Sequence, residues 1–148
     1  MQIKDIMTPS VRTVSPTDTL RDAALIMAEA DIGALPVAEG DRLTGMVTDR
    51  DIAIRGVALG KHGDAAVSEV MSNEVLYCFN DESAAAVSSN MGDLQVRRLP
   101  VLDRDKRLVG IVSLADLACS ADTESAGEAL GAITRPGGEH SQVSDTRM

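Results

Sequence analysis

The stretch Gly45-Met46-Val47-Thr48-Asp49-Arg50-Asp51 returns, 65 residues later, as Gly110-Ile111-Val112-Ser113-Leu114-Ala115-Asp116. Two shorter stretches return with a shift of 64 residues: Ile6-Met7-Thr8 as Val70-Met71-Ser72, and Leu35-Pro36-Val37 as Leu99-Pro100-Val101. A longer turn in the second copy, 103–107 against 39–42, explains the change of one residue. A unit repeated at this length is a supersecondary block that buries its apolar face against its twin. The cleft between the twins is therefore the natural place to look for a site.

Length and composition restrict the function classes. The chain has 148 residues, about one domain, and a formal net charge of −9 from 14 basic and 23 acidic residues. This acidic excess argues against nucleic acid or an anionic membrane surface as the main partner. Tyr77 and Phe79 are the aromatic residues of the whole sequence, so we expect an aliphatic core.

Cysteine spacing and the N-terminal sequence give no sign of metal or export. Cys78 and Cys119 form no CxxC pair, so the sequence predicts neither a metal site nor a redox dithiol. The N-terminus leads into no apolar signal segment. The longest uniformly apolar run, 23–28, is too short to span a bilayer. We therefore expect a soluble cytoplasmic protein.

Each copy predicts the same order of elements. In the first copy, a lead (3–7) and an extended stretch (11–14) precede a helix that starts near Leu20 and ends near Asp31, with Gly33 as the stop. Strands at 34–37 and 43–47 follow, and a second helix starts at Asp49. The second copy matches this plan, with an extended stretch at 75–79 and Gly92 weakening its first helix.

These patterns predict four segments. The first repeat covers 1–56, a linker covers 57–66, and the second repeat covers 67–119. Residues 120–148 are rich in Gly, Ser and Asp and predict a polar, mobile tail with a short helix near 128–133.

The repeated residues resemble a pair of cystathionine β-synthase (CBS) domains, the Bateman module. The marks in the first copy are Asp5-Ile6-Met7-Thr8, Gly33 to Val37 and Gly45 to Ile52; in the second they are Val70-Met71, Arg97 to Val101 and Gly110 to Leu117. None of these motifs is specific to the family by itself, but their occurrence in the same order in both copies is strong evidence for the resemblance. With nothing else attached, the chain resembles stand-alone bacterial CBS-pair proteins, including the hypoxic-response type.

The resemblance implies an α+β fold of two β-α-β-β-α repeats about a pseudo-twofold axis, and commonly a homodimer. It also implies two clefts that bind adenosine-containing ligands: AMP, ADP, ATP or S-adenosylmethionine. No cofactor is required, and the protein partner that would be regulated stays unknown.

The residues themselves suggest how such a cleft works. Thr48 and Asp51 lie at a strand end and on the following helix, so their side chains converge. A carboxylate there can accept hydrogen bonds from ribose hydroxyls, and the hydroxyl and helix amides can meet a phosphate or the sugar. The alternative is that Thr48 only caps the helix, with Asp49 or Asp51 favourable to its dipole. Ser113 and Asp116 repeat the arrangement.

The resemblance assigns the remaining residues to the clefts. It implies that residues before Leu-Pro-Val in one repeat face the T/S-x-x-D of the other repeat. The first predicted cleft then combines Thr48, Asp51, Tyr77, Cys78, Arg97 and Arg98 and prefers phosphate. The second combines Thr13, Val14, Gly33, Ala34, Ser113 and Asp116 and is expected to be weaker, empty, or selective for an uncharged adenosine group. The alternative for Arg97 and Arg98 is a surface pair among the many acids.

The sequence is compatible with three classes of function. The leading hypothesis is a regulatory module that senses adenosine nucleotides and signals to a protein partner. The alternative is a structural or stress-associated dimer with no small ligand. An enzyme is disfavoured because the sequence lacks HExxH, a P-loop and G-x-S-x-G, and its two histidines, His62 and His140, lie near no plausible nucleophile.

Overall fold

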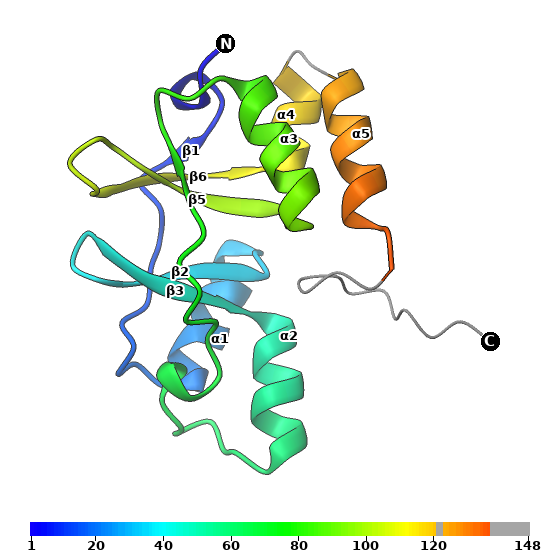
Figure 1. Cartoon of the computed structure of the whole chain (residues 1–148). Helices are drawn as coiled ribbons and strands as arrows, with labels where there is room; N and C mark the ends of the chain where they lie inside the picture. The colour runs from blue at the N-terminus through cyan, green and yellow to red at the C-terminus, as the bar shows by residue number, and fades with distance from the viewer. Residues whose placement is uncertain (121–122, 137–148) are drawn as a thin grey trace. The chain divides into compact units, whose positions relative to one another are not determined.

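A computed structural model describes residues 1–120 and 123–136, which form two compact units (Figure 1). The central unit spans Val11–Leu76. The terminal unit combines Met1–Ser10 with the chain from Tyr77 onward. Each unit contains a helix, an antiparallel strand pair and a second helix in that order, as the repeat predicts.

The central unit is built from α1 (Leu20–Ala30), β2 (Ala34–Glu39), β3 (Arg42–Thr48) and α2 (Asp49–Asp51). The chain continues after α2 as a π-helical segment (Ile52–Gly56) and a 3₁₀ turn (Val57–Leu59). Strands β2 and β3 pair antiparallel from Ala34 opposite Thr48 to Glu39 opposite Arg42. The apolar stripe of α1 packs against this hairpin and makes an aliphatic core; its buried members include Val14, Leu20, Ala23, Met27, Leu35, Val37 and Val47.

The terminal unit is built from β1 (Thr8–Pro9), β4 (Cys78–Phe79), α3 (Ala84–Leu94), β5 (Arg98–Leu102), β6 (Leu108–Ser113), α4 (Leu114–Ser120) and α5 (Thr123–Ile133). Its sheet has the order β1-β6-β5-β4, with β5 and β6 antiparallel and β4 and β5 parallel. The extended stretch expected at 75–79 forms a strand only at Cys78–Phe79.

The lead of each copy packs on the hairpin of the other copy. In the terminal unit, Thr8 pairs with Ile111 of β6. In the central unit, the Ser72 backbone exchanges two hydrogen bonds with Met46 of β3. Glycines make both approaches possible, since a Cβ on Gly45 would overlap the Ser72 carbonyl and one on Gly110 would lie 2.9 Å from the Thr8 carbonyl oxygen. The compact units therefore cut across the repeat boundaries expected at 1–56 and 67–119.

Helix ends follow local chemistry. Thr19 caps α1 by accepting from the Asp22 amide, and Ser83 caps α3 in the same way from Ala86. The stop of α1 is not Gly33 as expected: Asp31 adopts the left-handed conformation, with φ 54°. Asp is one of the few non-glycine residues that tolerate this conformation, so a glycine is not needed there.

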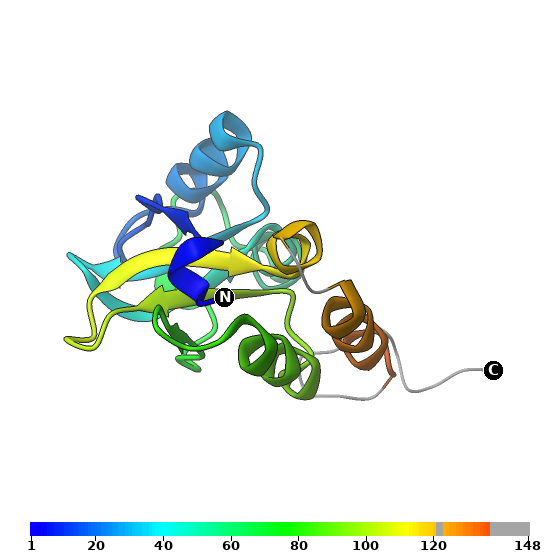
Figure 2. The same cartoon turned by 90° about the horizontal axis from the view of Figure 1, so that it is seen from above.

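The segment after Ser120 differs from the expected polar tail. Helix α5 starts at Thr123, five residues before the short helix expected near 128–133. It buries Ala129 and Ile133 and contacts α3 and α4; in both ribbon views it lies beside α3 (Figures 1 and 2). The two glycines of α5 lower its intrinsic helix propensity. Packing of its apolar face against α3 and α4 compensates for that loss. The mobility expected for 137–148 falls outside the described residues.

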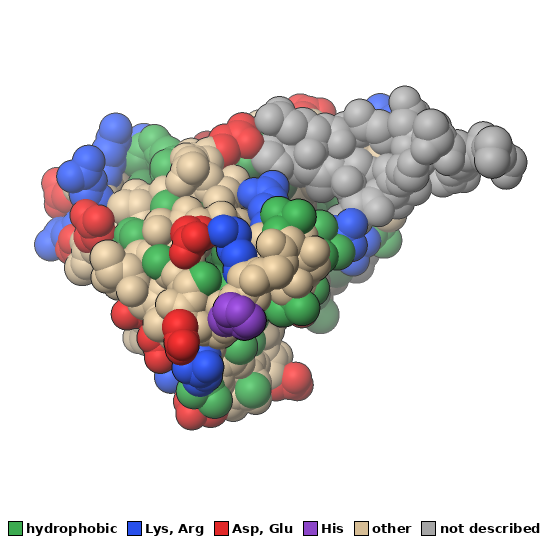
Figure 3. Space-filling model, turned by 90° about the horizontal axis from the view of Figure 1, so that it is seen from below, with side chains coloured by type: hydrophobic (Ala, Val, Ile, Leu, Met, Phe, Trp, Pro, Cys, Tyr) green, Lys and Arg blue, Asp and Glu red, His purple; other side chains and the backbone are tan. Residues whose placement is uncertain are grey.

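The surface carries both signs of charge. On the face seen in Figure 3, acidic and basic side chains are interspersed, with groups of hydrophobic side chains between them. Among the described residues, no helix is both long enough and apolar enough to cross a membrane.

Candidate ligand-binding sites

Thr48 and Asp51 form a reciprocal hydrogen-bonded pair where β3 leads into α2. The Asp51 amide donates to Thr48 Oγ1 at 3.0 Å, and the Thr48 amide donates to Asp51 Oδ2 at 2.9 Å. The Asp51 side chain is 18% exposed, and its second oxygen, Oδ1, lies 3.9 Å from Arg55 Nε. The pair therefore caps α2, and one carboxylate oxygen of Asp51, Oδ1, lies outside the cap.

Ser113 and Asp116 repeat this geometry in the terminal unit. The Asp116 amide donates to Ser113 Oγ at 3.0 Å, and the Ser113 amide donates to Asp116 Oδ2 at 2.9 Å. Asp116 is half-buried, and no residue of the described chain donates a hydrogen bond to its Oδ1. A half-buried carboxylate oxygen of this kind is a strong acceptor for a ligand hydroxyl.

A third pair shows that the spacing alone does not define a ligand site. Thr19 and Asp22 exchange the same two hydrogen bonds, at 3.1 and 3.0 Å, at the start of α1. The pKa of Asp22 is lowered, chiefly because the Thr19 amide donates to its carboxylate. Asp22 is exposed, whereas Asp51 and Asp116 are half-buried. Burial therefore distinguishes the two repeated pairs from an ordinary cap.

Strand register brings the residues before each Leu-Pro-Val next to the pair of the same unit. In the central unit, Ala34 lies opposite Thr48, and the Asp49 amide donates to the Gly33 carbonyl at 2.9 Å. In the terminal unit, Arg98 lies opposite Ser113, and the Leu114 amide donates to the Arg97 carbonyl at 2.8 Å. The structure thus brings Arg97 and Arg98 to Ser113, a neighbourhood that the assignment to clefts did not include. The expected pairing of these arginines with Thr48 and Asp51 joins the two units and stays a prediction.

The extended residues that the resemblance assigns to the two clefts lie partly in the core. Val14 is buried in the central core, and Thr13 beside it is half-buried. The Cys78 side chain is 3% exposed, and burial, with a smaller effect of Glu82, raises the pKa of its thiol to about 12. The half-buried Tyr77 ring stands edge-on to Phe79, with centroids 5.4 Å apart. The Val14 amide donates to the Pro36 carbonyl, and the Val14 carbonyl accepts from the Ala38 amide, so both backbone groups of Val14 are already bonded. Among these residues, the half-buried side chains of Thr13 and Tyr77 are the ones left to contact a ligand.

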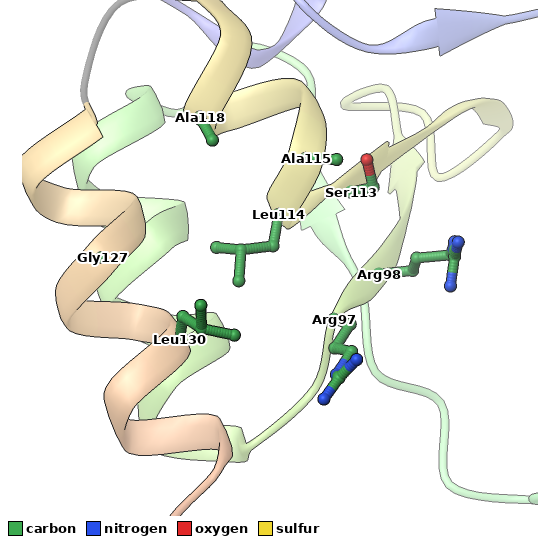
Figure 4. A pocket seen from close by; sticks show the side chains of 8 residues that line it. All are labelled: Arg97, Arg98, Ser113, Leu114, Ala115, Ala118, Gly127 and Leu130. Carbon is green, nitrogen blue, oxygen red and sulfur yellow. The ribbon is translucent and has the colours of Figure 1, made fainter.

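A cavity of about 460 Å³ lies wholly within the terminal unit (Figure 4). Its lining residues come from the start of β5 and the residue before it, the end of β6, α4 and α5: Arg97, Arg98, Ser113, Leu114, Ala115, Ala118, Gly127 and Leu130. The Leu114 and Leu130 side chains extend into the space between α4, α5 and β5. Both arginine side chains are exposed, and neither has a hydrogen-bond or ion-pair partner among the residues that the structure describes.

The α5 side of this cavity was missed from the sequence. Leu130 lies beside Ala129 and three residues before Ile133, a helical spacing of apolar residues that could have signalled a packed helix. Gly127 and Gly131, which disfavour a helix, and the polar residues around them made the pattern look like a loop. No group of three or more His, Cys, Asp or Glu that could hold a metal ion occurs in residues 1–120 and 123–136.

Comparison with known proteins bears on these repeats. The family model of the CBS domain matches twice, at residues 3–56 and 67–120. The chain belongs to the CBS domain family. Its sequence is 47% identical over 133 residues to the CBS domain-containing protein YhcV of Bacillus subtilis, covering 89% of this chain and 94% of that one. It is 44% identical over 117 residues to hypoxic response protein 1 of Mycobacterium tuberculosis, covering 78% and 81%.

Solved structures of CBS-pair proteins have the same fold. The crystal structure of Hypoxic Response Protein I with two coordinated zinc ions matches with a TM-score of 0.75 at 42% identity, covering 81% of this chain and 98% of that one. CBSX2 in complex with AMP matches with a TM-score of 0.72 at 25% identity, covering 82% and 96%. The CBS domain pair of protein MJ0100, in complex with 5-methylthioadenosine and S-adenosyl-L-methionine, matches with a TM-score of 0.72 at 29% identity, covering 80% and 97%. The expected family and α+β fold are confirmed.

Proposed function

We propose that this chain is a regulatory module that binds adenosine-containing ligands at its two T/S-x-x-D pairs and transmits their presence to a protein partner. The observation that carries the proposal is the half-buried carboxylate of Asp116, which uses Oδ2 in its cap and leaves Oδ1 without a described donor. The AMP complex of CBSX2 and the 5-methylthioadenosine and S-adenosylmethionine complex of MJ0100 support the class of ligand.

The chemistry of the pair suits a ribose. Oδ2 of each aspartate accepts the backbone hydrogen bond of the cap, so the orientation of the carboxylate is fixed before any ligand binds. Oδ1 can then accept hydrogen bonds from sugar hydroxyls without a further loss of side-chain conformational entropy. Hydrogen bonds to charged acceptors contribute roughly 1.5–3 kcal/mol each, enough to make one carboxylate important for affinity.

The positive charge near Ser113 favours ligands that carry phosphate. Arg97 immediately precedes β5 and Arg98 is its first residue, opposite the end of β6. Both side chains are exposed and, among the residues that the structure describes, have no partner that would compete with an anion. We therefore place AMP, ADP and ATP ahead of S-adenosylmethionine for the terminal unit. The counterpart residues in the central unit, Gly33 and Ala34, bring no charge.

The molecule is proposed as a homodimer whose partner protein stays unknown. Large apolar side chains of the segment after α2 are strongly exposed: Ile54, Val57 and Leu59. Exposed apolar groups of this kind are typical of an interaction surface. They also favour the second candidate function, a structural dimer without a small ligand, because such a dimer needs an apolar interaction surface but no ligand-binding site.

Thermal unfolding with a panel of AMP, ATP and S-adenosylmethionine tests the proposal. A ligand present at 100 times its dissociation constant stabilises the folded state by about 2.7 kcal/mol. For a chain of this length, the unfolding midpoint should rise by about 5–10 °C. Guanosine monophosphate is the control for non-specific anion binding. A midpoint that no adenosine ligand raises, at millimolar concentration and constant salt, supports the structural dimer instead.

A further inference from the structure

The cavity of the terminal unit has two chemically different sides. Arg97 and Arg98 are exposed, cationic and without a described partner. The opposite side is apolar, with Leu114 and Ala118 from α4 and Leu130 from α5. Figure 4 shows the two leucines extending from different helices into the same space. A cavity of about 460 Å³ falls within the range of small-molecule sites.

Helix α5 is held in place mainly through residues other than Leu130. Ala129 and Ile133 are buried. The side chain of Gln95, at the end of α3, donates to the carbonyls of Ala132 at 2.9 Å and Arg135 at 2.8 Å. Leu130 is 46% exposed, a large apolar side chain facing a cavity that water would otherwise fill. A ligand that enters the cavity would therefore bury the Leu130 side chain and gain the free energy of that apolar contact.

We infer that this cavity takes an anionic ligand with a flat apolar body, and that Leu130 of α5 is one of the residues that bind it. The inference rests on the proposed function, because a nucleoside monophosphate is the ligand of that description which the module would sense. The phosphate pairs with Arg97 and Arg98, and the base lies against Leu114, Ala118 and Leu130. Binding then adds contacts to α5, so the helix becomes the element that reports an occupied site.

The ligand's charge follows from the same residues. Two guanidinium groups that have no ion-pair partner in residues 1–120 and 123–136 attract a phosphate and repel the sulfonium of S-adenosylmethionine. The apolar side adds little for inorganic phosphate, which has no body to bury. Adenosine lacks the anion and loses the arginine contacts. AMP should therefore bind more tightly than adenosine, S-adenosylmethionine or inorganic phosphate.

Titration calorimetry of the full chain with these four probes tests the inference, using Leu130→Ala against Leu25→Ala as the control. Leu25 is a matched residue, since it is 54% exposed on α1 of the other unit. Leu130→Ala should weaken AMP binding about five- to tenfold, from the loss of most of one apolar contact. Leu25→Ala should leave the affinity unchanged. Hydrogen exchange should show slower exchange of the 123–133 amides when AMP is bound, a readout that affinity alone does not give.

The outcomes separate this inference from the proposed function. AMP binding that Leu130→Ala does not weaken, with unchanged exchange in α5, overturns the inference and leaves the proposed function standing. Inorganic phosphate binding as tightly as AMP overturns the role of the apolar side. Failure of the wild-type chain to bind any of the four probes contradicts both.

Discussion

Gly92 of α3 lies against Ala129 of α5, so closely that a Cβ on the glycine would stand 3.2 Å from the Ala129 Cα. The same Cβ would stand 3.3 Å from the Cβ of Ala132. A glycine inside a helix costs roughly 0.5–1 kcal/mol relative to alanine. In this chain the missing side chain lets α5 pack closely against α3, which compensates for the cost.

Replacing Gly92 with leucine should separate the two helices. Overpacking of a close contact typically costs about 1–3 kcal/mol, so urea unfolding should show a loss of that size, and the 123–133 amides should exchange faster. The matched control is Ala28→Leu, because Ala28 holds the aligned position on α1 and is exposed. Equal stability of the two variants would show that the contact is not tight in solution.

The two cysteines should react at very different rates. Cys119 is exposed, whereas Cys78 is buried and its thiol has a pKa of about 12. A thiolate is the reactive form, so a disulfide reagent at pH 8 should modify one thiol per native chain and the second only after unfolding. Cys119→Ser should remove the fast reaction. A fast second equivalent in the folded protein would contradict the burial of Cys78.

The same thiol makes stability depend on alkaline pH. In the unfolded chain Cys78 ionises near its ordinary pKa of 9.0, but in the folded chain it stays protonated until about pH 12. The unfolded state therefore loses a proton first, and the free energy of unfolding should fall as pH rises from 9 toward 12. Urea midpoints of wild type and Cys78→Ala at pH 8 and 10.5 measure this. The drop should be larger in the wild type, and an equal drop would exclude Cys78 as its source.

A side chain at Gly110 should displace β1 from the sheet. Its Cβ would lie 2.6 Å from Met7 Sδ and 2.9 Å from the Thr8 carbonyl oxygen, and the carbonyl cannot move without breaking the β1–β6 pairing. We expect Gly110→Ala to cost about 2–3 kcal/mol in chemical unfolding. Gly131→Ala is the control, since nothing lies within 4 Å of its Cβ and a helix gains from alanine. A neutral Gly110→Ala would mean that the lead does not pack as described.

The sequence predicted the parts of this fold that depend on local and repeated signals. The helices near Leu20 and Ala84 and the two hairpins follow from apolar spacing and turn residues. The T/S-x-x-D pairs were found because they recur at one spacing; a single pair would have looked like the cap at Thr19. The residue types of a T/S-x-x-D pair predict which hydrogen bonds it can make, but they do not predict whether the pair is buried.

The rest depended on tertiary packing. The exchange of leads could not be read from the repeat, because Thr8 and Ser72 fit either hairpin equally well by sequence. Helix α5 has two glycines, and its stability comes from α3 and α4, which no local pattern reveals. The neighbourhood of Arg98 and Ser113 needed the register of β5 against β6.

Calorimetric titration of AMP into the wild type and into capping-box variants tests directly whether Asp51 and Asp116 bind ligand. Asp51→Asn and Asp116→Asn keep the amide oxygen that each cap needs and remove the second carboxylate oxygen. Asp22→Asn makes the same change in a cap that we assign no ligand. Each of the first two variants should lose one site or about 10–100-fold in affinity, from roughly 1.5–3 kcal/mol of charge-assisted hydrogen bonding. Asp22→Asn should bind AMP like the wild type. Unchanged AMP binding in the double variant Asp51→Asn/Asp116→Asn would show that neither aspartate binds the ligand.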